Sequence, residues 1–268
     1  MSLIHLSNPS GTNPESNDYL AERFVDGDYP YIAMDWRDNP FIDKEAYSNT
    51  LSELDYVDQQ FQKYGNWHYK PVQGDLISRE EVLKQVTTIN TDYAYSLISI
   101  DLAGKGKDKF AVCRYDYHQN GLTSIVDFAQ TESANVEDLL LRFVEKHNPS
   151  LALPSTSLII IEQEGGGSPV YAQRYFQELI PQIPVILKTP KGNKYQRARP
   201  LMNMLRNGNV KISQACSCLE DFIDEAVSLN PMGKGKSPNL VDSVTLAHNY
   251  LNEEVLGKQS SIRIGGHI

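Results

Sequence analysis

Three acidic residues stand where a rigid backbone would hold them at the end of a strand or the start of a helix. Apolar runs at 96–100 and 158–161 lead directly into Asp101 and Glu162, and residues 237–242 open a helix that carries Asp242. Carboxylates about 4 Å apart repel by roughly 4 kcal/mol at an effective dielectric of 20, so such a cluster needs cations or raised pKa values. Oxygen ligands in that number suit Mg²⁺ or Mn²⁺. The three acids together suggest a divalent-metal site, although each alone could be an ordinary surface acid.

Two of these positions have alternatives. Glu164 follows Glu162 by two residues and precedes the glycines 165–167, which would let a phosphate approach closely or simply form a flexible turn. Glu162 is the better ligand candidate because it ends the apolar run, with Glu164 as its substitute. Asp242 lies off the main apolar stripe of its helix, on the same side as Asn239. Either both residues line a site, or Asp242 is a surface acid.

Charge is unevenly distributed along the chain. The formal net charge is −9, yet residues 1–92 carry 16 acidic and 7 basic residues while residues 93–268 carry 18 of each. The stretch 188–211 contains seven basic residues and no acid. A polyanion responds to such a local run rather than to the total charge. The alternative is a solvated loop and helix face.

Three other sequence patterns argue against nucleotide binding, a zinc site and membrane association. The segment Gly233–Ser237 imitates the end of a P-loop, but Asn230 stands where the motif needs glycine and no strand precedes it, so we do not expect nucleotide binding there. Cys113, Cys216 and Cys218 lack zinc-site spacing and are predicted to be reduced thiols of a cytoplasmic protein. No apolar run approaches the roughly 18 residues that span a bilayer, so no membrane association is expected.

Residues 93–188 contain the elements that must position these acids. Three strand-like runs at 93–101, 109–116 and 122–129 are joined by short polar links, which require antiparallel pairing. The expected elements that follow are a helix at 135–147, a strand at 157–162, a helix at 169–179 and a strand at 185–188. A helix between two strands makes them parallel. If the fourth strand lies beside the first, Asp101 and Glu162 are neighbours.

This order of elements resembles the RNase H-like nuclease fold, an α/β fold in which a mixed sheet of three antiparallel and then parallel strands is flanked by helices. More narrowly, residues 93–268 resemble the nuclease domain of the large terminase subunit, the DNA-packaging enzyme of tailed bacteriophages. The matching pieces are Ser99-Ile100-Asp101-Leu102-Ala103, Ile160-Ile161-Glu162-Gln163-Glu164-Gly165, Lys194-Tyr195-Gln196-Arg197-Ala198 with Pro200, Asn207-Gly208-Asn209-Val210, and Asn239-Leu240-Val241-Asp242-Ser243.

The first third is similar to the stretch that follows the motor core in the same subunit. Residues 5–11 are similar to the end of the ATPase core, while residues 38–41 and 65–67 resemble the segment leading to the nuclease. A helix is predicted at 44–63, and no sheet is expected in this third. The resemblance implies a remnant of the ATPase domain at 1–65, a linker at 66–92 and the nuclease domain at 93–268. Because the chain lacks Walker motifs, no ATPase activity is expected from it.

The resemblance implies a metal-dependent endonuclease that cuts double-stranded DNA during phage genome packaging. Two Mg²⁺ or Mn²⁺ ions would be held with Asp101 bridging them, Glu162 on one ion, and Asp242 with Asn239 on the other. Many relatives carry paired aspartates at the start of the late helix, where this chain has Pro238-Asn239. That departure leaves Asp242 as the only acid there.

The basic run would then contact DNA phosphates without reading sequence. The residues expected to do so are Lys191, Lys194, Arg197 and Arg199. Further expected partners are a terminase small subunit, a portal and the ATPase domain, in the host cytoplasm. The alternatives are another RNase H-like nuclease of the resolvase or transposase type, or a non-catalytic module that docks on a motor or portal.

Overall fold

The computed structural model describes residues 9, 14–52, 54, 56–72, 74–89, 92–102, 109–132, 136–148, 156–163, 168–230 and 237–257. The chain forms two compact units, Met1–Leu76 and Ile77–Ile268. Glu164, the glycines 165–167 and most of the P-loop-like segment, residues 233–236, lie outside the described residues. In the described part of the chain, no helix is long and apolar enough to cross a bilayer.

The first unit consists of short helical pieces in its described part, which holds no strand. They are α1 (Pro14–Leu20), η1 (Ala21–Val25), η2 (Trp36–Asp38), α2 (Lys44–Ser52), α3 (Tyr56–Asp58) and η3 (Gln59–Lys63). The helix predicted over 44–63 is therefore present as three successive pieces. Leu51, Val57 and Phe61 are buried, and the indole N–H of Trp36 donates to the Lys63 carbonyl at 3.0 Å.

The second unit is built on a seven-stranded sheet in the order β1-β7-β4-β3-β2-β5-β6. The strands are β1 (Val86–Thr87), β2 (Tyr93–Asp101), β3 (Phe110–His118), β4 (Thr123–Thr131), β5 (Leu158–Glu162), β6 (Val185–Lys188) and β7 (Val210–Ser213). β2, β3 and β4 pair antiparallel, β5 pairs parallel with β2, and β6 pairs parallel with β5. The predicted mixed α/β sheet is thus confirmed.

The far edge of this sheet was not part of the sequence-based prediction. β7 pairs parallel with β4, and the short β1 pairs parallel with β7. β1 and helix α4 (Arg79–Leu83) belong to the second unit, although both fall in the segment 66–92 that was expected to be a linker.

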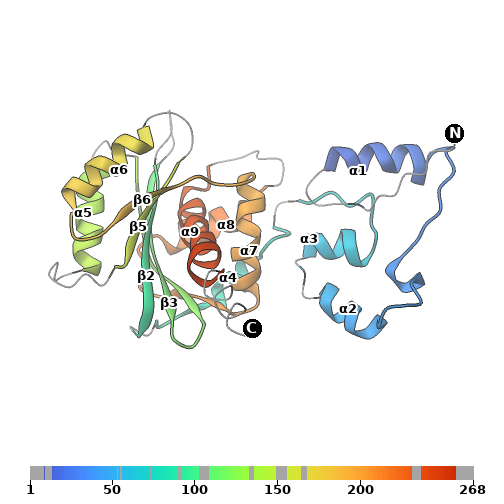
Figure 1. Ribbon diagram of the computed structural model, residues 1–268, viewed down its shortest axis with the longest axis horizontal. Coiled ribbons are helices and arrows are strands. Elements are labelled where there is room, and N and C mark those ends of the chain that lie inside the picture. The colour runs from blue at the N-terminus through green and yellow to red at the C-terminus, as the bar shows by residue number, and fades with distance from the viewer. Residues whose placement is uncertain are drawn as a thin grey trace, which may run out of the picture. The chain divides into compact units, whose positions relative to one another are not determined.

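Helices cover both faces of the sheet (Figure 1). α5 (Val136–His147) and α6 (Ser168–Leu179) cover one face, and α9 (Asn239–Tyr250) lies on the other with α7 (Lys194–Arg206) and α8 (Leu219–Ser228). α9 continues into η4 (Leu251–Leu256). Because both faces are covered, β2 and β5 read as continuous apolar runs rather than as alternating ones.

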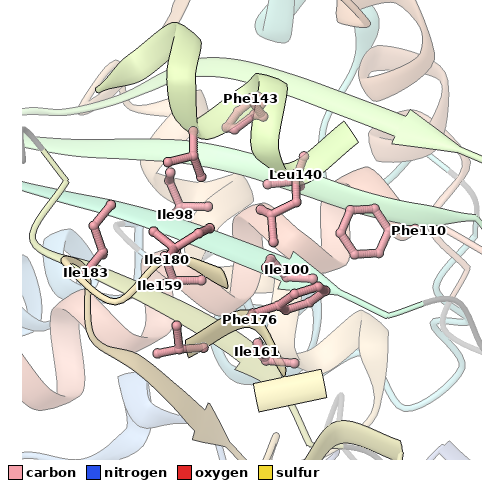
Figure 2. Packing of buried hydrophobic residues seen from close by; sticks show 13 residues of the cluster. Ile98, Ile100, Phe110, Leu140, Phe143, Ile159, Ile161, Phe176, Ile180 and Ile183 are labelled. Atoms are coloured by element: carbon pink, nitrogen blue, oxygen red, sulfur yellow. The ribbon is translucent and has the colours of Figure 1, made fainter. Parts of the chain in front are cut away.

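The core on the α5 and α6 face combines side chains of these two helices with alternate residues of β3, β2 and β5 and with Val185 of β6 (Figure 2). Its members include Ile98, Ile100, Phe110, Ile159, Ile161, Leu140, Phe143 and Phe176. Ser99, between Ile98 and Ile100, points to the opposite face, where its hydroxyl donates to the Ser243 carbonyl in α9 at 2.6 Å. The bond from Ser99 thus ties β2 to the first half of α9, while the core on the opposite face joins β2 to β5.

Candidate metal and nucleic-acid site

Asp101 and Glu162 end two neighbouring parallel strands. Ile100 on β2 is in register with Ile161 on β5, so the acid that follows each of them emerges at the same edge of the sheet. Glu162 is 4% exposed, whereas Asp101 is half-buried. The geometric part of the prediction, that these two acids are neighbours, follows directly from this register.

Asp242 lies in the first turn of α9 and is only 3% exposed. Its backbone N–H donates to the Pro238 carbonyl at 2.8 Å, which makes it part of the helix start. The bond from Ser99 to the Ser243 carbonyl joins the residue after Asp242 to the strand residue two positions before Asp101. α9 therefore presents Asp242 beside the end of β2, and Asp242 is not the surface acid that its position off the apolar stripe allowed.

The charges of all three acids act on a single lysine, Lys194. Its ammonium lies 2.5 Å from a carboxylate oxygen of Asp242 and donates to the Ser237 hydroxyl at 3.2 Å. Burial alone would lower the pKa of Lys194, but the negative charges of Asp242, Asp101 and Glu162 outweigh it and raise the pKa above its usual value. Of the three predicted acids, Asp242 pairs directly with Lys194, and Asp101 and Glu162 act on it through their negative charge.

Arg197 is a second cation of this site. Its Nη1 lies 2.5 Å from Glu162 Oε1 and its Nη2 lies 3.8 Å from Asp242 Oδ1, with the Arg197 side chain only 8% exposed. The guanidinium thus links the end of β5 to the start of α9. The side-chain amide of Asn249 in α9 also donates a hydrogen bond to the backbone carbonyl of Arg197 at 3.1 Å.

The start of α7 sets where these two cations lie. Asn193 caps the helix by accepting from the Gln196 N–H at 2.8 Å, and its own N–H donates to the Gln196 side chain at 3.4 Å. This reciprocal cap makes Lys194 the first helical residue and places Arg197 one turn later on the same side. Both side chains can therefore reach the acids from one helix end.

The donor set consists of carboxylate oxygens, which are the ligands that Mg²⁺ and Mn²⁺ prefer. Within the described residues, however, no group of three or more His, Cys, Asp or Glu side chains is arranged to hold a metal ion. The positive charge that the cluster requires comes instead from Lys194 and Arg197. The ligand chemistry fits a divalent cation, whereas the arrangement seen here is the cation-paired one.

The remaining predicted residues are distributed around this cluster. Asn239, the first residue of α9, is 5% exposed and lies three residues before Asp242. Lys191 is exposed in the loop before α7, and Arg199 is partly buried within that helix. Of the four basic residues expected at phosphates, Lys194 and Arg197 have their charged groups on the acids, and Lys191 is the most exposed.

One buried acid of this region was missed from the sequence. Glu225 in α8 is 7% exposed, and its carboxylate accepts the backbone N–H groups of Leu240 and Val241 at 2.8 and 3.1 Å. The available signal was its place next to the apolar stripe of α8, because Phe222 and Ala226 flank it on the buried side of that helix.

No protein-family model matches the sequence, and no curated protein matches it. Solved structures do match. The large terminase from a thermophilic bacteriophage aligns with a TM-score of 0.62 at 14% identity, over 93% of this chain and 62% of that chain. The complex of the same phage protein with ADP aligns with a TM-score of 0.61 at 15% identity, over 93% and 61%. This chain thus spans about three fifths of the length of that phage terminase.

A human cytomegalovirus terminase nuclease domain, soaked with Mn and bound to an inhibitor, aligns with a TM-score of 0.50 at 14% identity. That match covers 67% of this chain and 96% of the viral domain. At such identities structural similarity establishes the fold alone. The resemblance to large terminases and their nuclease domains is therefore confirmed at the level of the fold.

Proposed function

We propose that this chain is a terminase-type endonuclease that uses divalent metal ions to cut double-stranded DNA during phage genome packaging. The observation that carries the proposal is that Lys194 and Arg197 join Asp242 and Glu162 through ion pairs, while Asp101 ends the strand that neighbours the one ending in Glu162. Glu162 and Asp242 are both buried and share Arg197 as a partner, and stability alone does not explain their proximity, since burying like charges together is costly.

Asp101, Glu162 and Asp242, together with Asn239, would hold two Mg²⁺ or Mn²⁺ ions. Bound there, such a pair supplies an activated water and stabilises the leaving oxygen of a phosphodiester. Glu164 remains an alternative to Glu162. The chain's own contribution is to keep these oxygens fixed on the sheet edge and on α9.

Lys194 and Arg197 would have two successive roles. In the arrangement described above they neutralise the acids. If the acids were neutralised by bound divalent ions, Lys194 and Arg197 would be available to the phosphate groups of the substrate, together with Lys191 and Arg199. A lysine and an arginine so close to the acids would position the duplex backbone without reading its sequence.

The proposed partners follow from the same assignment. They are double-stranded DNA, a terminase small subunit, a portal and an ATPase domain, in the cytoplasm of the infected host. ATP hydrolysis is not proposed for these 268 residues, because the sequence carries no Walker motif.

Plasmid cleavage by the purified chain tests the proposal. With Mn²⁺ or Mg²⁺ we expect nicked and linear products, and Asp101→Asn should abolish them because an amide cannot supply the anionic oxygen of a metal ligand. The matched control is Asp138→Asn, which removes an exposed acid of α5 that forms an ion pair with Arg142. That variant should cleave as the parent does.

Two outcomes would reject the proposal. Absence of cleavage with either metal, or an Asp101→Asn variant as active as the parent, would remove the catalytic assignment. A strong preference for four-way junctions or RNA–DNA hybrids over linear duplex would instead point to a resolvase-type or transposase-type nuclease on the same fold.

A further inference from the structure

The amino-terminal end of α9 lacks a cap from its own sequence. Its N-cap residue is Pro238, whose side chain makes no capping bond. The neighbouring Ser237, a residue type that often caps helices, accepts a hydrogen bond from Lys194 instead. The first backbone N–H groups of any α-helix have no partner within the helix, and this helix end is buried.

Glu225 supplies the missing cap from a different helix. One oxygen of its carboxylate, Oε2, accepts both the Leu240 and the Val241 N–H groups, at 2.8 and 3.1 Å. These are the second and third residues of α9, the positions that an ordinary N-cap side chain would satisfy. The carboxylate also places negative charge at the positive end of the helix dipole.

The capped turn is the one that carries the proposed metal ligands. Asn239 and Asp242 flank the two residues whose N–H groups Glu225 accepts, so the position of both side chains depends on this turn. Ser99 fixes the next residue, Ser243, to β2. Glu225 and Ser99 thus hold the same turn from two sides.

We propose that Glu225 is a positioning residue for the metal site: its carboxylate caps α9 from α8 and thereby fixes Asp242 and Asn239 for metal binding. This inference rests on the proposed metal-dependent function. Its consequence is that Glu225 controls the metal affinity of a site that it does not touch. Groups that orient metal ligands from behind typically change affinity by about 10-fold to 100-fold when removed.

The test compares Glu225→Ala, Glu225→Gln and Glu225→Asp in the whole 268-residue chain. Mn²⁺ binding is measured by calorimetric titration, and amide hydrogen exchange of a peptide covering 239–245 is measured without metal. Glu220→Ala is the matched control, since Glu220 lies on the same helix but pairs with Arg79 rather than with α9.

We expect Glu225→Ala to weaken Mn²⁺ binding by about tenfold or more and to speed exchange in the peptide. Glu225→Gln keeps an acceptor oxygen, so its Mn²⁺ affinity and its exchange rate should both stay within about threefold of the parent values. Glu220→Ala should change neither the affinity nor the exchange rate. Glu225→Asp, too short to reach both N–H groups, should bind Mn²⁺ more weakly than Glu225→Gln. If Glu225→Ala does not fold, the comparison of Mn²⁺ affinity between Glu225→Gln and Glu225→Asp still tests the proposal.

Unchanged Mn²⁺ affinity in Glu225→Ala, even with a lower melting temperature, would mean that Glu225 only stabilises the fold and would overturn the inference. The reverse order of the Gln and Asp variants would overturn it as well. If the parent chain itself binds no Mn²⁺, the proposed function fails. In that case the positioning of metal ligands falls with it, and the exchange data report whether the cap alone exists.

Discussion

His248 lies within a buried hydrogen-bonded chain that ties α9 to the sheet. The Asn252 amide donates to its Nε2 at 3.0 Å, so Nδ1–H donates to the Tyr115 hydroxyl at 2.8 Å, and that hydroxyl donates to Thr123 Oγ1 at 2.8 Å. The His248 ring is 1% exposed. Burial lowers the pKa of His248 to about 4, so the folded protein holds the neutral imidazole.

The lowered pKa makes stability depend on pH in a defined direction. Above pH 6.5, the ordinary pKa of histidine, His248 is neutral in both the folded and the unfolded chain, and its full contribution is present. As the pH falls from 6.5 toward 4, the unfolded chain binds a proton that the folded chain does not, and stability is lost. At about 1.4 kcal/mol per pKa unit, the gap between 6.5 and about 4 corresponds to about 3 kcal/mol of unfolding free energy.

The assay is urea unfolding at pH 7 and pH 4 of the parent and of His248→Gln. Far-UV circular dichroism is needed, because Trp36 and Trp67 both lie in the first unit and fluorescence would report that unit. We expect the variant to lose about 3 kcal/mol less than the parent between the two pH values, since carboxylate titration is common to both. His68→Gln, at a half-exposed histidine, serves as the control.

If His248→Gln lost as much stability on acidification as the parent, this prediction would be wrong. Such a loss would mean that the folded protein accepts a proton on His248 as readily as the unfolded chain does, and that the buried chain through Tyr115 does not require the neutral ring.

Three further outcomes are expected. Asp116→Ala should lower the unfolding free energy by about 3 kcal/mol, because it removes the carboxylate to which the buried Arg114 guanidinium donates at 3.0 and 2.9 Å. A loss under about 1 kcal/mol in chemical denaturation would contradict this prediction. Burial raises the pKa of Cys216 to about 12, so an aromatic disulfide reagent at pH 8 should label this thiol far more slowly in the folded than in the urea-unfolded protein. Equal labelling rates in the two states would contradict the raised pKa. Replacing Lys191 and Arg199 with alanine should weaken duplex DNA binding and flatten its salt dependence by about one unit of slope per lost phosphate contact, measured by fluorescence anisotropy; an unchanged slope would show that both are merely solvated.

The sheet was largely predictable because its signals are local. Short polar links between apolar runs at 93–129 require antiparallel pairing, and the helix between 129 and 157 requires a parallel return, which together place Glu162 beside Asp101. β1 and β7 escaped prediction because each is short and pairs with strands distant in the sequence. Val86 and Thr87 are β-branched residues that favour strands, but a run of two residues is too short to predict one.

The start of α9 was harder to interpret for a different reason. An apolar stripe indicates the buried face only when the opposite face meets water, but residues 239–248 are all buried in α9. Periodicity therefore could not decide between a site and a surface position for Asp242. The pairing of Lys194 and Arg197 with acids, and the cap from Glu225, depend on tertiary packing that no spacing in the sequence encodes.

The most direct test of the metal site is a crystal of this chain soaked in Mn²⁺ and measured for anomalous scattering. We predict peaks within coordination distance of Asp101, Glu162 and Asp242, with the Lys194 ammonium displaced from Asp242. Absence of any peak at these carboxylates, with Lys194 still paired to Asp242 at a Mn²⁺ concentration that supports cleavage, would contradict the proposed metal-dependent nuclease.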